Sequence, residues 1–294
     1  SYGRPEITKL ADGTWVVLVT SGYNNVNPGN GQGYLYAIDA GTGAAIHTIG
    51  TGVGSDTAAI TGVCAAAPCP SGLAQIRAYV DNARYDNRTT KVYGSDLYGN
   101  VWRFDVNDTF GASGREAQLL ASLRGPGGNV QSLMTRPEVG LVANIPVVFV
   151  GTGRYLGAGD LADATVQSIY AIKDSGGNTS MGNPRSDLTA TGFVQQTLTT
   201  ATCGASAYCT TGQTIRTGST NAVNFATQKG WFIDLPGTGE RANTDPQLAL
   251  GTLAITTNVL DPLACSVGGS SFINFLDYRT GQAVSTANGM ASVY

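Results

Sequence analysis

The stretch Lys91-Val-Tyr-Gly-Ser-Asp-Leu-Tyr-Gly-Asn-Val-Trp-Arg-Phe-Asp-Val-Asn-Asp108 decides the fold. Two short runs of β-forming residues, Val92–Tyr93 and Val101–Val106, flank a turn around Gly99. β-Branched and aromatic residues favour strands, whereas Asp, Asn and Gly favour tight turns. The stretch therefore predicts a β-hairpin.

The pattern of the second strand of this hairpin recurs along the chain. In each copy, a turn residue precedes an aromatic and aliphatic run, and the run usually closes on an acidic residue. The copies close at residues 39, 105, 173, 234 and 277, at intervals of 66, 68, 61 and 43 residues. A repeat at this spacing predicts stacked units of short antiparallel strands.

A longer internal duplication supports the repeat. Arg4-Pro-Glu-Ile7 is followed by the apolar run Trp15–Thr20 and then by Tyr34–Asp39. The same order returns from residue 136, in the segments Arg136-Pro-Glu-Val139, Val147–Val150 and Ile169–Ile172. Two copies of one strand order indicate that the chain repeats a single supersecondary unit.

These repeats predict an all-β fold, a β-propeller or a partial propeller arc of four-stranded antiparallel blades with long inserted loops. The 294 residues include 40 Gly and only 13% charged residues, which suits short strands and tight turns. We expect residues 1–294 to form a single propeller fragment. Five repeats are fewer than in most closed rings and the chain begins at Ser1, so we expect a piece of a longer protein.

The intervals between repeats predict two inserted surface loops, at about residues 50–81 and 174–224. Both are rich in small polar residues and too poor in apolar residues to form domains. Loops of this kind often carry binding specificity. Leu161–Ile172 is the one plausible short helix.

Five cysteines lie in or near these loops. Cys64 and Cys69 form one close pair, Cys203 and Cys209 form another, and Cys265 stands alone. Close pairs in Gly- and Ala-rich loops predict two disulfides and an oxidising compartment. The alternative is a zinc site with four thiolates, which the spacings do not favour. Cys265 is then either a buried free thiol or has its partner outside this chain.

Charge argues against a nucleic acid partner, and hydropathy argues against a membrane-spanning segment. The net charge is −3, the pI is about 5.1, and the 17 Lys and Arg residues are scattered. The chain therefore lacks the basic patch that phosphate backbones require, and we expect no nucleic acid partner. The longest apolar runs, such as Ile145–Val150, are too short to span a bilayer.

The chain resembles the C-terminal propeller of the PilC/PilY proteins, which are type IV pilus tip-associated adhesins and biogenesis factors. The similar segments are the hairpin motif at 92–105, Leu35–Gly43, Val148–Gly157 and Gly268–Gly281, while residues 180–228 are not covered. The resemblance implies an exported, non-enzymatic module for surface adhesion or pilus assembly, which reaches the cell surface through the periplasm. Its implied partners are pilus tip proteins, pilin subunits, or a host or abiotic surface receptor.

The same resemblance implies a calcium loop directly before the hairpin. The candidate ligands are Asp81, Asn82, Asp86 and Asn87. Calcium takes six to eight oxygen ligands, but two of the family's ligand positions hold Arg84 and Thr90 in this chain. The alternative is a polar loop in which Arg84 or Arg88 replaces the metal by pairing with Asp86.

We expect no catalytic residues and no organic cofactor. His47 is the only histidine and falls in a predicted strand. The Gly151–Gly157 turn resembles a dinucleotide-binding turn but belongs to the blade repeat, and the acid pairs Asp160/Asp163 and Glu240/Asp245 show no common cleft. The alternatives to a binding module are a quinoprotein- or glycosidase-like propeller enzyme and a purely structural scaffold.

Overall fold

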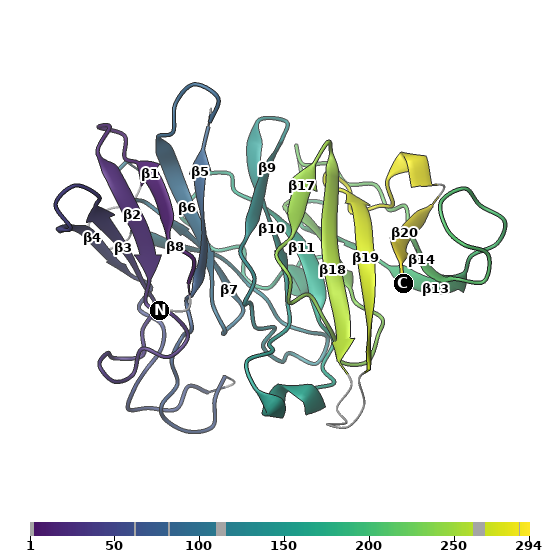
Figure 1. Cartoon of the computed structure of the whole chain (residues 1–294), viewed down its shortest axis with the longest axis horizontal. Helices are drawn as coiled ribbons and strands as arrows, with labels where there is room; N and C mark the ends of the chain where they lie inside the picture. Colours follow the sequence, from purple (N-terminus) through teal and green to yellow (C-terminus); the bar gives the residue numbers. More distant parts are fainter. Residues whose placement is uncertain (1–2, 62, 82, 110–115, 261–267, 288) are drawn as a thin grey trace. The chain divides into compact units, whose positions relative to one another are not determined.

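The computed structural model describes residues 3–61, 63–81, 83–109, 116–260, 268–287 and 289–294. In this part the chain is almost wholly β, with 20 strands and three short 3₁₀ helices (Figure 1). The chain divides into two compact units. Unit 1 comprises residues 1–123, 132–137 and 177–182, and unit 2 comprises residues 124–131, 138–176 and 183–294.

Unit 1 contains two four-stranded antiparallel sheets, each with its strands in chain order. The first sheet consists of β1 (Glu6–Lys9), β2 (Trp15–Thr20), β3 (Tyr34–Asp39) and β4 (Ala45–Gly50). The second consists of β5 (Gln75–Val80), β6 (Thr89–Ser95), β7 (Asn100–Phe104) and β8 (Ala117–Ser122). Such meanders are the unit expected of a propeller blade, and the predicted hairpin is β6–β7.

Unit 2 contains two larger sheets. The five-stranded sheet has the order β12-β15-β11-β10-β9 and comprises β9 (Glu138–Val142), β10 (Ile145–Gly151), β11 (Ser168–Lys173), β12 (Phe193–Gln196) and β15 (Gly230–Asp234). The seven-stranded sheet has the order β13-β14-β20-β19-β18-β16, and β17 also pairs with β18.

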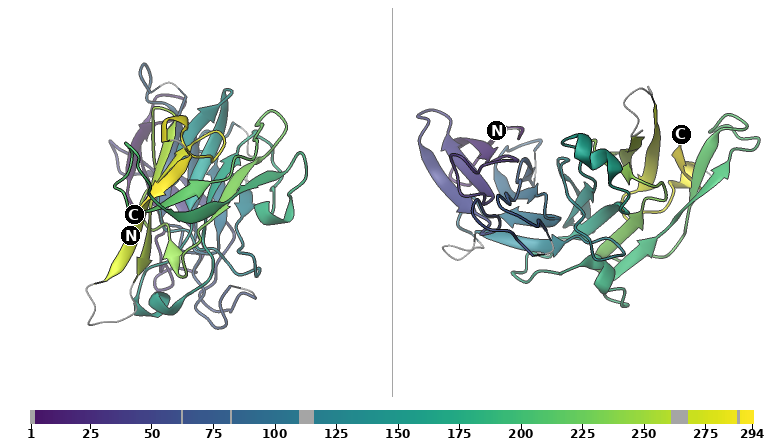
Figure 2. Two further views of the ribbon diagram at one scale, coloured as in Figure 1. Left: turned by 90° about the vertical axis from the view of Figure 1, so that its right-hand side faces the viewer. Right: turned by 90° about the horizontal axis from the view of Figure 1, so that it is seen from below.

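The strands of this seven-stranded sheet are β13 (Leu198–Thr202), β14 (Thr214–Gly218), β16 (Glu240–Arg241), β17 (Gln247–Ala249), β18 (Thr252–Leu260), β19 (Gly269–Asp277) and β20 (Met290–Val293). The 3₁₀ helices are η1 (Ala158–Ala162), η2 (Pro184–Ser186) and η3 (Ser285–Ala287). Figure 2 shows the long strands β18 and β19 side by side.

The predicted duplication is confirmed, because β1-β2-β3 and β9-β10-β11 have the same order and the same antiparallel pairing. The number of repeats needs a correction. The copy that closes at Asp234 is β15, which pairs with β11, the copy that closes at Lys173. The five repeats therefore correspond to four sheets in the described part of the chain. The repeated pattern therefore identifies an inner strand that ends in a polar turn. It does not identify the same strand position in every sheet.

Within each unit, apolar side chains of two sheets form one core. In every strand that contributes, alternate residues point to the same face and are buried. The unit 1 core includes Val16, Leu18, Leu35, Ala37, Ile76, Val92, Trp102 and Phe104. The unit 2 core includes Val147, Phe149, Ile169, Ala171, Trp231, Leu253, Ile255, Leu276 and Ala291.

The predicted loop at 174–224 contains more structure than the sequence indicated. It contributes β12, β13 and β14 to the two sheets of unit 2, and β12 runs parallel to β15. Within unit 1, Met181 N donates to the carbonyl of Leu120 in β8, and the Gly182 carbonyl accepts from Ser122 N. β12 and β13 are edge strands, and the three Thr residues of β13 are exposed, as one face of an antiparallel sheet can be. We call residues 174–224 the insertion.

Two further expectations differ in detail. The predicted loop at 50–81 ends in a strand, β5, although the described residues between 51 and 74 form no regular strand. The helix predicted over Leu161–Ile172 is wrong, because η1 ends at Ala162 and β11 begins at Ser168. The β-branched residues and Tyr170 pair in the sheet, and this pairing overrides the weak helical pattern.

Two copies of one turn give a matched stability test. The turns Asp39–Gly43 and Asp277–Gly281 both end in a glycine with positive φ, +74° in Gly43 and +70° in Gly281. A Cβ on Gly281 would lie 2.7 Å from the ring of Trp231, whereas a Cβ on Gly43 would meet nothing within 4 Å. We expect Gly281→Ala to lower the free energy of unfolding by about 2–4 kcal/mol, and Gly43→Ala by only about 1–2 kcal/mol. Urea denaturation of both variants checks this, and equal losses would contradict it.

Candidate functional site

The turn of the β6–β7 hairpin is organised by one fully buried carboxylate. Asp96 accepts hydrogen bonds from the backbone N–H groups of Tyr98 and Asn100, at 2.9 and 3.0 Å. It also accepts from Asn100 Nδ2 at 3.1 Å and from the indole Nε1 of Trp102 at 2.8 Å. Burial raises the pKa of Asp96 to about 6, although these four donors favour its charged form. The residues of the family motif thus form a rigid structural turn.

The predicted calcium loop lies directly before this hairpin, between β5 and β6. Asp81 and Asp86 both line a pocket of about 280 Å³. Arg88 Nη1 lies 2.7 Å from Asp86 Oδ2, so the predicted alternative pair is present with Arg88 as the partner. The Asn87 carbonyl accepts hydrogen bonds from Lys9 N at 3.0 Å and from Thr8 Oγ1 at 2.9 Å. Asn82 lies outside the described residues.

These residues fit calcium poorly. A hard cation needs six to eight oxygens, and one of the two carboxylates here already bonds a guanidinium. Among the described residues, no group of three or more His, Cys, Asp or Glu side chains is placed to hold a metal ion. The calcium site stays a prediction.

Removing the guanidinium gives a direct test of this loop. We expect millimolar calcium to leave the melting temperature of the parent chain nearly unchanged, because Arg88 already neutralises Asp86. In Arg88→Ala, both carboxylates become available, and we expect calcium to raise the melting temperature by about 2–4 °C. The measurement is thermal melting with calcium and with a chelator. A large calcium effect on the parent chain would show that the metal binds beside Arg88.

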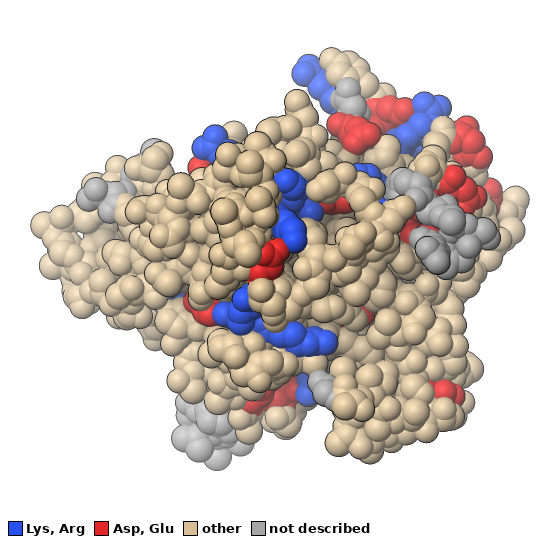
Figure 3. Space-filling model, turned by 180° about the vertical axis from the view of Figure 1, so that it is seen from behind, with Lys and Arg blue, Asp and Glu red and all other residues tan. Residues whose placement is uncertain are grey.

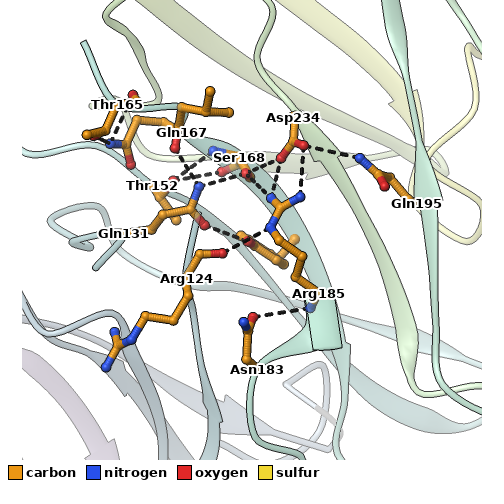
Figure 4. A network of polar contacts seen from close by, with 12 residues as sticks. Arg124, Gln131, Thr152, Thr165, Gln167, Ser168, Asn183, Arg185, Gln195 and Asp234 are labelled. Atoms are coloured by element: carbon orange, nitrogen blue, oxygen red, sulfur yellow. Dashed lines mark hydrogen bonds and ion pairs between the residues drawn. The ribbon is translucent and has the colours of Figure 1, made fainter. Parts of the chain in front are cut away.

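A second polar cluster anchors the insertion to the five-stranded sheet (Figure 4). Arg185 in η2 binds both oxygens of Asp234 at the end of β15, at 2.9 and 2.5 Å. Its Nε donates to the carbonyl of Arg124 at 3.1 Å, and its guanidinium lies 4.7 Å from the centre of the Phe232 ring. A bidentate, partly buried Arg–carboxylate pair fixes geometry as well as charge.

Further side chains complete the partner set of Asp234. Ser168 Oγ donates to its Oδ1 at 2.7 Å, and Gln195 Nε2 donates to its Oδ2 at 3.1 Å. Ser168 Oγ also accepts from Gln131 Nε2 at 2.8 Å, and Tyr170 donates to Gln131 Oε1 at 2.5 Å. Burial raises the pKa of Tyr170 to about 12, so its hydroxyl stays a donor. The cluster is an anchor whose charges neutralise one another.

A third polar cluster crosses the seven-stranded sheet. Arg216 in β14 binds Glu240 in β16 through two bonds of 2.6 and 2.7 Å, and both side chains are at most 2% exposed. Thr257 Oγ1 donates to Glu240 Oε1 at 2.5 Å. Asn274 links Thr257 to Ser292, so the polar row reaches five strands. Sequence reasoning missed this row because its members lie far apart along the chain.

The candidate catalytic acids have structural partners. Glu240 is buried against Arg216 and is closed to a substrate. Asp160 accepts from Arg154 Nε at 2.7 Å and from the backbone N–H of Leu156 at 2.8 Å.

His47 lies in β4, opposite Ala37 in the sheet. The Gly151–Gly157 turn leads from β10 into the five-residue 3₁₀ helix η1, not into the helix that a dinucleotide fold requires.

Both predicted disulfides are confirmed, Cys64–Cys69 and Cys203–Cys209. Tyr98, next to the hairpin turn, donates to the carbonyl of Cys69, which ties the first disulfide loop to the second sheet. The second disulfide closes the loop between β13 and β14, which extends away from the strands (Figure 1) and leaves Tyr208 56% exposed. Cys265 lies outside the described residues.

Figure 3 shows one face of the chain with its charged residues coloured. Uncharged residues cover most of this face, and acidic side chains lie beside the basic ones. Within the described ranges, no helix has the length and apolar character that a membrane crossing needs.

The topology defines a class of protein: a disulfide-containing all-β domain of the β-propeller type, built mainly from antiparallel strands. The model of the PilY1 β-propeller domain family matches residues 1–213. This match covers most of the chain, and the chain belongs to the PilY1 β-propeller domain family.

Individual relatives agree with the family. A type IV pilus biogenesis factor PilY1 homolog of Xylella fastidiosa is 28% identical over 96% of this chain, and the PilY1 factor of Pseudomonas aeruginosa is 29% identical over 96%. The crystal structure of the P. aeruginosa PilY1 C-terminal domain matches with a TM-score of 0.70 and 23% identity, over 100% of this chain and 65% of that one. The chain spans only 19% and 25% of the two curated relatives.

Proposed function

We propose that this chain is the propeller module of an exported type IV pilus tip factor, and that it acts by binding, without covalent chemistry. Its partners in this proposal are pilus tip proteins or pilin subunits, together with a host or abiotic surface receptor. It would reach the cell surface through the periplasm, where both disulfides can form.

The observation that carries the proposal is the family match over residues 1–213, since relatives across this range are named pilus biogenesis factors. The organisation of the polar side chains supports binding over catalysis. Asp96, Asp234 and Glu240 are each occupied by structural hydrogen bonds. Rigid sheets that present disulfide-closed loops suit a recognition surface.

Co-sedimentation with type IV pili tests the proposal. The purified chain is mixed with sheared pili from the organism that encodes it, and pili are collected by centrifugation. We expect the parent chain to sediment with pili. A variant in which residues 203–209 are replaced by a Gly-Ser linker of equal length should sediment less if this loop contacts the pilus. A folded chain that stays in the supernatant would refute the pilus partner.

A purely structural scaffold is the second candidate. It predicts that the 203–209 variant sediments as the parent does, whereas disruption of a sheet abolishes sedimentation. The 203–209 variant can distinguish the two candidates, because Arg185 and Asp234 anchor the insertion and lie outside the replaced loop.

A further inference from the structure

A pocket of about 340 Å³ lies in unit 2 on the insertion and the turn that follows it, and none of its lining residues carries a formal charge. Leu188, Phe193 and Val194 form its apolar part. Three side-chain amides, those of Gln195, Asn221 and Gln228, form its polar part. We call it the amide pocket. Its volume lies within the range of small-molecule sites, which combine apolar walls with a few placed polar groups.

The orientation of each amide follows from its partner. Gln195 must direct its NH₂ group at Asp234, because a carboxylate only accepts; the distance is 3.1 Å (Figure 4). Asn221 must direct its NH₂ group at the carbonyl of Gln195, at 2.8 Å. Gln228 must direct its oxygen at the backbone N–H of Asn224, at 2.7 Å.

These bonds leave one half of each amide unused. Among the residues that the structure describes, the side-chain oxygens of Gln195 and Asn221 accept no hydrogen bond, and the NH₂ group of Gln228 donates none. The amide pocket thus offers two fixed acceptors and one fixed donor. A ligand that fills it needs groups that both donate and accept.

The backbone that carries these amides is held in place. Asn221 N donates to Gln196 Oε1 at 3.1 Å, and the Asn221 carbonyl accepts from Gln196 Nε2 at 2.7 Å and from Gln282 Nε2 at 2.9 Å. Gln195 is tied to the Arg185–Asp234 anchor. A ligand would therefore find the groups already positioned, which lowers the entropy lost on binding.

We propose that the amide pocket binds a neutral saccharide unit. Sugar hydroxyls donate to carbonyl oxygens and accept from NH₂ groups, which matches the unused halves of the three amides. The C–H face of a sugar ring can rest on Leu188, which is 54% exposed. An acidic sugar is disfavoured, since the nearby Lys229 is already bound to Asp187 at 2.6 Å.

Sugar binding in this pocket would identify the class of receptor that the proposed function requires. Only its role in adhesion rests on the proposed function. Sugar binding by the purified chain needs no pilus. Failure of sugar binding with retained pilus sedimentation therefore overturns the amide pocket alone, and the reverse result overturns the pilus partner alone.

Saturation-transfer NMR of the purified chain tests the pocket. The probes are D-glucose, D-galactose and N-acetyl-D-glucosamine, with N-acetylneuraminic acid and a Gly-Ser-Thr peptide as competing classes. We expect transfer to at least one neutral sugar. Asn221→Ala and Gln228→Ala should each weaken binding about five- to tenfold, because each removes one hydrogen-bonding group. Gln247→Ala, at an exposed position in β17, is the matched control and should bind as the parent does.

Three results would overturn the proposal. They are no transfer to any neutral sugar, equal binding by the parent and both pocket variants, or a response only to the acidic sugar or the peptide. Circular dichroism of each variant separates a lost pocket from a lost fold. If Asn221→Ala unfolds, Gln228→Ala decides the result, since its side chain bonds only within the 224–228 turn.

Discussion

Glu240→Ala should lower the free energy of unfolding by about 3–5 kcal/mol, the largest effect expected of any single substitution in unit 2. The Arg216 side chain is 2% exposed, and both of its Nη atoms bond Glu240. Loss of the carboxylate leaves a buried cation without its counter-charge. Thr257 Oγ1 and the backbone N–H of Gly237 lose the same acceptor. Because small domains are stable by only about 5–15 kcal/mol, the variant should be close to unfolding at room temperature.

Urea denaturation, followed by tryptophan fluorescence, measures this loss. The control is Arg279→Ala, which removes a surface pair with Asp277 whose arginine side chain is 59% exposed. Screened surface pairs contribute at most about 1 kcal/mol, so this variant should stay near the parent. The double variant Arg216→Met with Glu240→Leu should be more stable than Glu240→Ala, since no charge remains buried. A Glu240→Ala chain within 1 kcal/mol of the parent would show that water reaches Arg216.

The contrast between these clusters explains what the sequence can predict. Asp96, Asn100 and Trp102 lie within seven residues, so their hairpin and turn are visible as a local pattern. The disulfides are also local, with separations of five and six residues. Arg216, Glu240 and Asn274 belong to one polar row that forms only after five strands have paired, and no spacing along the chain predicts it.

The insertion shows the same limit. Its composition predicts a surface loop, yet Arg185 crosses to Asp234, 49 residues later, and β12 pairs with β15 in parallel. In the predicted calcium loop, the sequence predicts an ion pair but not which arginine forms it. The charged residues between Asp81 and Thr90 were visible, but only the fold determines that Arg88, rather than Arg84, bonds Asp86. Gln195, Asn221 and Gln228 belong to no sequence motif, and only the fold brings their side-chain amides together.

Asp96→Asn should lower the free energy of unfolding at neutral pH by about 2–4 kcal/mol and remove part of the pH dependence of stability. One side-chain oxygen can still accept from the N–H groups of Tyr98 and Asn100. The new NH₂ group then faces the indole N–H of Trp102, which is itself a donor and loses its partner. The control is Asp12→Asn, an exposed turn residue that accepts one backbone N–H, where we expect a change within about 0.5 kcal/mol.

The pH dependence follows from burial. Asp96 titrates at about 6 in the folded chain, against an ordinary value of 3.8. Between these two pH values the folded chain binds more protons than the unfolded chain, so the contribution of Asp96 is full below pH 3.8 and is lost as pH rises through about 6. Subtracting the Asp96→Asn stability curve from that of the parent, from about pH 4 to pH 7, should isolate this loss. If the difference between the two chains stays constant across that range, Asp96 is ionised throughout and its four donors outweigh its burial.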